Sequence, residues 1–442
     1  MVQGLTGEVI TPQNPLYNDA RQGWNRAVQK FPLAIVYCTN REDISNAIHW
    51  ARRHCIPLRI RSGGHNYEGY SNGNGALVID VSRMQGMWLN GNLLTIEPGV
   101  QFRVLYEYVT SLGYPFPGGE CPTVGAVGYT LGGGWGLSAR RYGLGSDSLL
   151  EAELMDFNGH ILRANAQCHP DLFRALQGSG GGNFGVVVSM TYRLPPRVER
   201  VTYITFNYEN TDQRKQCAFL AAWQRFLPCL DERLTAIAGL YRSAKDGFGI
   251  FGRALFYGPP NEARSAMRPL DSVPGGSYSY QYLSLYDTLQ QVMEEFPPYE
   301  LFKSTSRFVM HPLDAHTIGS VTGLIRTVPE GSVYSALTLF TLGGQVAKRA
   351  PSSTAYFYRK ALYLLGIQSV WEDPQYTGVN SAWVNQQFQY LKKVTQGSFV
   401  NFPINELPDY MQAYYGGNVA ALQSVNRAYD PNNVFCYPQC IR

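Results

Sequence analysis

One histidine, His65, stands directly after a glycine pair in residues 61–75, RSGGHNYEGYSNGNG. The stretch holds five glycines, and glycine allows a backbone to approach a ligand closely or to turn with positive φ. The exposed N–H groups of such a loop can also cradle phosphates. We therefore expect a flat or anionic group to lie against this loop, where His65 could face it, bind it or be joined to it.

A cysteine, Cys121, stands in a second glycine-rich stretch, residues 118–136, GGECPTVGAVGYTLGGGWG. Both residue types are nucleophiles: a neutral imidazole attacks through its free lone pair, and a cysteine attacks as its thiolate. Glycines cluster at 63–64, 118–119, 132–136 and 178–185. Four such clusters with two nucleophiles beside them indicate a bound ligand rather than ordinary tight turns.

One of these clusters, GGGNFG at 180–185, matches the dinucleotide-binding pattern G-x-G-x-x-G as letters. The Rossmann fingerprint requires a strand before the glycines and a helix after them. Here VVVSMTYRL follows and predicts a strand. A Rossmann site for NAD is therefore excluded.

The other histidines and cysteines do not predict a metal site. His311 and His316 are five residues apart with Pro312 between them, which is not the i, i+4 spacing of one helix face. Cys436 and Cys440 are separated by three residues, and the chain has no C-x-x-C. We therefore expect free thiols and no metal.

Length and composition are those of an ordinary globular protein with two domains: 442 residues, 45% hydrophobic, with a net charge of +4. This charge is too mild and too evenly spread to favour nucleic acid or an anionic membrane as partner. The N-terminus has no visible signal peptide, and no run of 18 or more apolar residues occurs. We expect a cytoplasmic monomer or homodimer with no nucleic-acid or membrane partner.

The pattern of predicted elements divides the chain near Pro195 and Pro196. Alternating strands and helices make residues 1–195 an α/β unit, which includes a strand at 33–37 and then a helix capped near Thr39 or Asn40. Residues 196–407 read as half-buried strands and helices, and the tail, 408–442, as a helix that Asp430 and the following proline end. The fold class is therefore α+β, with further strands expected at 57–61, 76–82, 93–99, 201–208, 234–241 and 249–258.

Four motifs occur together: GGHNYEGYS, GGECPTVGAVGYTLGGGWG, DLFRALQGSGGGNFGVVVSMTYRL and the tail YYGGN…DPNNVF. With them the chain resembles the berberine bridge enzyme-like flavoproteins of the vanillyl-alcohol oxidase-type FAD-binding superfamily, and we expect a bacterial member. The resemblance covers nearly the whole chain, and G-G-H paired with a downstream G-G-x-C-P-T-V-G is hard to reach by chance. It implies a two-part FAD-binding domain, a substrate domain whose antiparallel sheet is flanked by helices, and a tail that returns to the FAD-binding domain.

The resemblance also implies that FAD is tethered twice. His65 would join the 8α-methyl carbon and Cys121 would join C6 of the isoalloxazine. Two bonds would hold the ring rigidly and raise its potential, which favours hydride acceptance from difficult donors. Further contacts with the cofactor are implied for Arg61, Ser62, Gly63, Gly64, Gly125, Gly128, Gly182, Asn183, Gly185 and Val187 and, near the isoalloxazine, for Asn418.

The residue three after the linking cysteine borders the space over C4a, where oxygen approaches in this family. Valine there marks oxidases, whereas leucine blocks entry and marks dehydrogenases. This chain has Val124. We therefore expect an oxidase that uses molecular oxygen.

The substrate side departs from the family pattern. Many members use a tyrosine that removes a hydroxyl proton, but Trp135 and Phe402 replace the two family tyrosines, and neither can accept a proton. A family glutamine is kept as Gln368, which could contact substrate or make a structural hydrogen bond. Either another base serves an apolar or aromatic substrate, or the alcohol-oxidising chemistry is lost. The candidate phenols are Tyr129, Tyr358 and Tyr414.

The expected function is that of an oxidase with bicovalent FAD. It would take hydride from an alcohol or amine carbon of a sugar or secondary metabolite and reduce oxygen to hydrogen peroxide. Two alternatives stay open. One is a dehydrogenase of the same fold that passes electrons to a quinone or a protein, and the other is a low-turnover flavin-binding protein with a structural or coat role.

Overall fold

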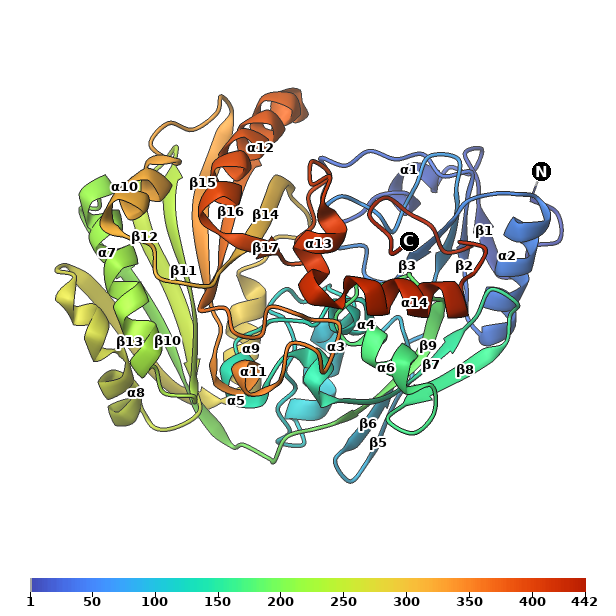
Figure 1. Cartoon of the computed structure of the whole chain (residues 1–442), viewed down its shortest axis with the longest axis horizontal. Helices are drawn as coiled ribbons and strands as arrows, with labels where there is room; N and C mark the ends of the chain where they lie inside the picture. The colour runs from blue at the N-terminus through green and yellow to red at the C-terminus, as the bar shows by residue number, and fades with distance from the viewer. Residues whose placement is uncertain (1) are drawn as a thin grey trace.

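The computed structural model describes residues 2–442, and these contain three β-sheets (Figure 1). The first sheet has the strand order β1-β2-β4-β3, and β4 runs parallel to both of its neighbours. Helix α2 (Arg41–Arg53) follows β2 as the sequence predicts, and the Asn40 side chain caps it by accepting the Asp43 N–H at 2.9 Å. The strands are β1 (Glu8–Ile10), β2 (Ala34–Tyr37), β3 (Leu58–Arg61) and β4 (Leu77–Asp80).

The second sheet is antiparallel and has the order β5-β6-β9-β7-β8. Strand β9 (Val186–Arg193) directly follows the GGGNFG cluster, so the prediction of a strand there, and with it the exclusion of a Rossmann turn, is confirmed. The other strands of this sheet are β5 (Met87–Asn90), β6 (Leu93–Ile96), β7 (Leu149–Met155) and β8 (Ile161–Asn165). The remaining helices of residues 2–195 are α1 (Tyr17–Ala20), α3 (Phe102–Thr110), α4 (Ala126–Leu131), α5 (Ala139–Tyr142) and α6 (Pro170–Leu176).

The third sheet has eight antiparallel strands in the order β13-β10-β12-β11-β15-β16-β14-β17, all from residues 200–398. Helices α7, α10 and α12 lie along one side of this sheet (Figure 1). The structure is thus α+β, while the domain limits at 195 and 407 stay predictions. The strands are β10 (Arg200–Tyr208), β11 (Leu234–Ser243), β12 (Gly247–Phe256), β13 (Gly276–Ser284), β14 (Leu301–Val309), β15 (Ser332–Thr341), β16 (Tyr363–Trp371) and β17 (Gln396–Ser398); the helices are α7 (Gln213–Phe226), α8 (Pro260–Met267), α9 (Leu285–Glu294), α10 (Ala315–Gly323), α11 (Gly344–Lys348) and α12 (Thr377–Val394).

The C-terminal tail forms two helices where the sequence predicts one: α13 (Tyr410–Tyr415) and α14 (Val419–Tyr429). The break lies at Gly416, which has φ +49°, and a Cβ there would lie 2.3 Å from the Phe357 ring. Glycine is therefore required at the break both for its conformation and for space. Helix α14 ends before Asp430 as predicted, and it packs against α6 of the N-terminal part (Figure 1).

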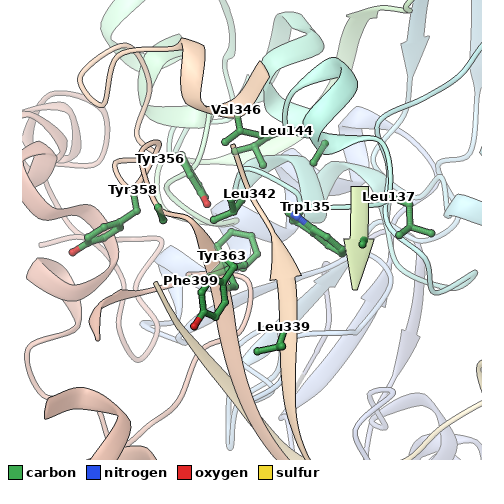
Figure 2. Packing of buried hydrophobic residues seen from close by; sticks show 14 of the residues in the cluster. Trp135, Leu137, Leu144, Leu339, Leu342, Val346, Tyr356, Tyr358, Tyr363 and Phe399 are labelled. Carbon is green, nitrogen blue, oxygen red and sulfur yellow. The ribbon is translucent and has the colours of Figure 1, made fainter. Parts of the chain in front are cut away.

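One hydrophobic core runs through both parts of the chain. Figure 2 shows Trp135 from the glycine-rich turn after α4 within a cluster that includes Leu339, Leu342 and Phe399. The Trp135 indole N–H donates to the Thr341 carbonyl at 2.8 Å, so a hydrogen bond also ties this turn to the end of β15. None of the helices in residues 2–442 is long and apolar enough to cross a bilayer. The expected cytoplasmic location and the monomeric or homodimeric state stay predictions.

Candidate functional site

A cavity of about 480 Å³ is lined by residues from both parts of the chain. Its size is typical of a site for a cofactor or small molecule. Three of the four glycine clusters reach it, and the fourth contributes Trp135. The glycines from these clusters that line the cavity are Gly63, Gly64, Gly119, Gly180, Gly181, Gly182 and Gly185.

The two predicted nucleophiles meet in this cavity. His65 lies in the loop after β3, and Cys121 lies in the loop between α3 and α4. The Thr123 hydroxyl lies 2.8 Å from the His65 Nε2 and 3.8 Å from the Cys121 Sγ. One hydroxyl therefore contacts both nucleophiles, which are 56 residues apart in the sequence.

Glycines allow these two loops to touch. A Cβ on Gly63 would lie 2.4 Å from the Gly125 nitrogen and 2.7 Å from the Thr123 carbonyl oxygen. A Cβ on Gly125 would lie 2.3 Å from the Ser62 Oγ. The close approach of the two loops therefore depends on the missing side chains.

The surroundings keep the His65 imidazole neutral. Burial lowers the pKa of His65 to about 3, and its ring stacks on Trp24 with centroids 5.1 Å apart. A neutral imidazole retains the lone pair that nucleophilic attack requires. The neutral state of His65 thus fits the covalent role that the family resemblance implies for it.

The surroundings of Cys121 disfavour its reactive form, the thiolate, whereas those of His65 favour the reactive neutral imidazole. Burial raises the pKa of the Cys121 thiol, and hydrogen bonds from Thr123 oppose this shift. At neutral pH the thiol is therefore the dominant form, and the thiolate that would attack a carbon is the minor one.

Two arginines of β3, one in the cavity lining and one outside it, have unused donors. Arg59 lines the cavity, and its Nε is buried without a hydrogen-bond partner among the described residues. Arg61 pairs through Nε with Asp80, and its buried Nη1 likewise finds no partner within residues 2–442. Buried guanidinium donors beside exposed glycine N–H groups suit a pyrophosphate. The residues present thus fit a dinucleotide such as FAD.

Most of the predicted cofactor contacts line the cavity, but Arg61, Asn183 and Asn418 do not. Asn183 lies behind the lining, where its Oδ1 accepts the Tyr437 hydroxyl at 3.1 Å. The predicted contacts in the lining are Ser62, Gly63, Gly64, Gly125, Gly128, Gly182, Gly185 and Val187.

Asn418, predicted to lie near the isoalloxazine, lies outside the cavity lining. The Asn418 amide donates to the carbonyls of Pro351 at 2.9 Å and Thr354 at 3.0 Å. Its Oδ1 accepts from Arg174 at 2.9 Å. A fully used amide of this kind holds the 351–354 loop and has no donor left for a cofactor.

One face of the eight-stranded sheet forms the far wall of the cavity. Thr338 and Phe340 on β15 and Gly366 and Gln368 on β16 all line it. Residues two apart on a strand point to the same face, so these side chains share one surface. Gln368, opposite Ser304 in the register, is thus placed to meet a ligand.

The positions of the two family tyrosines are apolar walls of the cavity. Trp135 and Phe402 both line it, as does Val124. Phe402 stacks on Tyr67 with centroids 5.1 Å apart and planes 6° apart. No sequence signal marks Tyr67 as a site residue, although it lines the cavity and lies two residues after His65.

Neither candidate phenol in the lining is a ready base. Tyr129 and Tyr414 line the cavity, whereas Tyr358 does not. The Tyr129 hydroxyl donates to the Pro117 carbonyl at 3.3 Å, and the Tyr414 hydroxyl donates to the Gln439 Oε1 at 2.7 Å. Burial raises the pKa of all three tyrosines, so each is a protonated phenol at neutral pH.

A buried ion pair at the substrate side was not predicted. Glu120, directly before Cys121, lies 2.7 Å from Arg253 of β12, and both line the cavity. Arg253 also pairs with Glu295. Burial raises the pKa of Glu120, and the Arg253 charge opposes the shift. This cluster presents charge to a wall that is otherwise largely apolar.

A second unpredicted carboxylate stands near Cys121. Burial raises the pKa of Glu300 to about 7, and its charge in turn raises the pKa values of Cys121 and Tyr67. The Glu300 backbone N–H donates to the carbonyl of Trp24, a residue of the cavity lining, at 3.2 Å. A group that titrates near neutrality beside a nucleophile is suited to proton transfer.

Within residues 2–442, no group of three or more His, Cys, Asp or Glu side chains could hold a metal ion.

Two family models match parts of this chain. Residues 32–165 match the family model described as FAD binding domain, and residues 398–442 match the one described as Berberine and berberine like. A two-part fold with a glycine-lined cavity and this match define an FAD-dependent oxidoreductase.

The chain is 33% identical to the uncharacterized FAD-linked oxidoreductase YgaK of Bacillus subtilis over 99% of this chain and 97% of that protein. It is 28% identical to the chitooligosaccharide oxidase of Gibberella zeae, covering 93% and 87% of the two chains. The solved structure of Physcomitrella patens BBE-like 1 has the same fold, with a TM-score of 0.91 and 24% identity over 99% of this chain and 97% of that one. The chain belongs to the berberine bridge enzyme-like family of FAD-linked oxidoreductases.

Proposed function

We propose that this chain is an oxidase with bicovalently attached FAD. It takes hydride from an alcohol or amine carbon of a sugar or secondary metabolite and reduces oxygen to hydrogen peroxide. The observation that carries the proposal is the meeting of His65 and Cys121 at the Thr123 hydroxyl, 2.8 and 3.8 Å away, in one cavity. The sugar class is supported by the similarity to a chitooligosaccharide oxidase.

The residues of the chain have separate roles in this proposal. His65 and Cys121 hold the isoalloxazine, and Arg59 offers its free Nε–H group to the pyrophosphate. When bound, the flavin supplies an acceptor for hydride and a donor of electrons to oxygen. Val124 leaves the approach to the ring open for oxygen.

The substrate lies against the sheet face in this proposal. Gln368 orients it through its amide, and Trp135 and Phe402 exclude water from the reacting carbon. A base with a shifted pKa must take the proton when an alcohol is the donor. The buried tyrosines are poor candidates for this step because burial holds their phenols protonated.

The covalent attachment is tested with purified protein by its visible spectrum before and after acid precipitation. Yellow colour that stays with the pellet is expected. His65→Ala and Cys121→Ala should each leave one linkage, and the double variant should release all of its flavin. Cys168→Ala is the matched control, because Cys168 is an exposed thiol outside the cavity lining. A double variant that stays yellow after denaturation contradicts the proposal.

The reaction is tested by peroxide release with a panel of sugars, alcohols and alkaloids. Peroxide formed in step with substrate is expected. Bleaching of the flavin without peroxide would instead indicate a dehydrogenase that uses another acceptor. Failure of every donor to bleach the flavin would favour a low-turnover flavin-binding role.

A further inference from the structure

Two cysteines of the C-terminal segment, Cys436 and Cys440, face each other. Their Sγ atoms are 3.5 Å apart, and both are free thiols. A tight turn brings them together: the Cys440 N–H donates to the Tyr437 carbonyl at 3.1 Å, and Gln439 has φ +63°. The fold therefore places two thiols in contact without any bond between them.

This turn is part of the cavity wall. Phe435, Tyr437 and Gln439, which flank or separate the two cysteines, all line the cavity. The Tyr437 hydroxyl donates to the Asn183 Oδ1 at 3.1 Å, and the Gln439 Oε1 accepts the Tyr414 hydroxyl at 2.7 Å. A change at the cysteines thus acts on groups that face the ligand.

Cationic groups stand on two sides of the pair. Arg442 Nη2 lies 3.3 Å from the Cys436 Sγ, and its Nε lies 3.5 Å from the Cys440 Sγ. Arg59 donates through Nη1 to the Cys436 carbonyl at 2.6 Å. Burial raises the pKa of the Cys436 thiol, and Arg442 counteracts this shift. A guanidinium in contact with both sulfurs stabilises the thiolate, which is the reactive form.

The two sulfurs differ in access. Cys436 is partly exposed, whereas Cys440 is buried with 1% of its surface accessible. A small oxidant from solvent therefore meets Cys436 first, and Cys440 is placed to attack the product. This is the arrangement of a reacting thiol with a resolving thiol beside it.

We propose that Cys436 and Cys440 form a reversible disulfide in the cavity wall when hydrogen peroxide oxidises them. The Cys436 thiolate attacks one peroxide oxygen, the O–O bond breaks, and hydroxide leaves; a sulfenic acid and, after the hydroxide takes up one proton, one water result. The Cys440 thiolate then attacks the Cys436 sulfur and displaces hydroxide, which takes up a second proton to become the second water; the two protons are those that the two thiols released. Two thiols lose two electrons in total, and one peroxide becomes two waters.

The source of peroxide in this inference rests on the proposed oxidase activity. Hydrogen peroxide released in turnover would then oxidise Cys436 and Cys440 to a disulfide, next to residues that line the ligand cavity. The bond ties the two ends of the turn that carries Tyr437 and Gln439, so the wall at that end of the cavity loses freedom of movement. Reduction by a dithiol restores the open form.

The disulfide is tested on the holoenzyme with added hydrogen peroxide, followed by trapping of free thiols and digestion with trypsin. Residues 428–442 leave as one peptide that carries both cysteines. The expected result is the loss of two hydrogens from this peptide, with no trapping at either cysteine, and full recovery after dithiothreitol. Cys440→Ser should stop at a sulfenic acid on Cys436 that a dimedone reagent captures. The exposed Cys168 of the same sample is the internal control.

The inference is overturned if both thiols remain free at a peroxide dose that oxidises Cys168. It is also overturned if Cys436 is oxidised while Cys440 stays a free thiol in the wild-type chain. A second arm uses substrate turnover in place of added peroxide, with and without catalase. If added peroxide forms the disulfide and turnover does not, the disulfide proposal stands. The proposed oxidase activity is then rejected as the source of the peroxide.

Discussion

Replacing Gly63 by alanine tests whether the contact between the two loops is what allows covalent attachment. The new Cβ would lie 2.4 Å from the Gly125 nitrogen, whereas ordinary contact begins at 3.4 Å. The loops that carry His65 and Cys121 must therefore separate by about 1 Å. A displacement of about 1 Å costs roughly 100-fold in the rate of a positioned reaction, which corresponds to about 2.7 kcal/mol of barrier.

The assay is the rate of covalent flavin incorporation after FAD is added to protein produced without it. Samples are quenched in acid at intervals, and the fluorescence of the denatured chain is measured. Gly378→Ala is the matched control: Gly378 lies on α12 outside the cavity lining, and a Cβ there meets nothing within 4 Å. The control should incorporate FAD at the wild-type rate. A Gly63→Ala protein that unfolds at the wild-type temperature and also incorporates FAD at the wild-type rate would refute the reasoning.

Three further predictions, made with four variants, have defined outcomes. Val124→Leu should slow reoxidation of the reduced flavin by oxygen and spare its reduction by substrate, as stopped-flow absorbance of the two half-reactions would report; equal slowing of both would exclude an oxygen-access role. In a His65→Ala background, attachment at Cys121 should accelerate about tenfold from pH 7 to pH 8, because burial raises the pKa of the thiol and the thiolate fraction grows about tenfold per pH unit below it. In a Cys121→Ala background, attachment at His65 should not change over this range, because a pKa of about 3 leaves the imidazole neutral throughout; a parallel rise in both would contradict the assignment. Gln368→Leu should lower kcat/KM about fivefold through the loss of one hydrogen bond of about 1 kcal/mol, measured as the rate of flavin bleaching at low substrate; an unchanged rate would place the amide outside the substrate contact.

Local signals in the sequence were sufficient where a short segment determines its own structure. The helix after β2 was predicted with its cap because Asn40 and the apolar spacing of Ile44 and Ile48 lie within one segment. The strand after GGGNFG was predicted because branched residues run directly from Val186. The flanking glycines also singled out His65, which lies in the cavity lining.

Distant neighbours decided the features that the sequence did not predict. The tail helix breaks at Gly416 because the Phe357 ring occupies the space beside it. Arg253 reaches Glu120 through the pairing of β12 within the eight-stranded sheet, which no local pattern encodes.

The position of Asn418 shows the limit of a motif carried over from relatives. The motif places a residue in the tail, but it does not say which carbonyls the side chain meets. In this chain they are those of Pro351 and Thr354. Residues matched to a family motif therefore need their contacts checked one by one.

The cavity takes its walls from residues as far apart as Trp24 and Gln439. A nascent chain that has already exposed His65 on the ribosome still lacks the wall formed by residues 435–439. If FAD is attached covalently as proposed, attachment must wait until synthesis has passed these residues and the tail has docked. Flavin that stays bound after denaturation would thus report only chains that completed folding. A stalled or truncated chain would carry no covalent flavin and would be colourless.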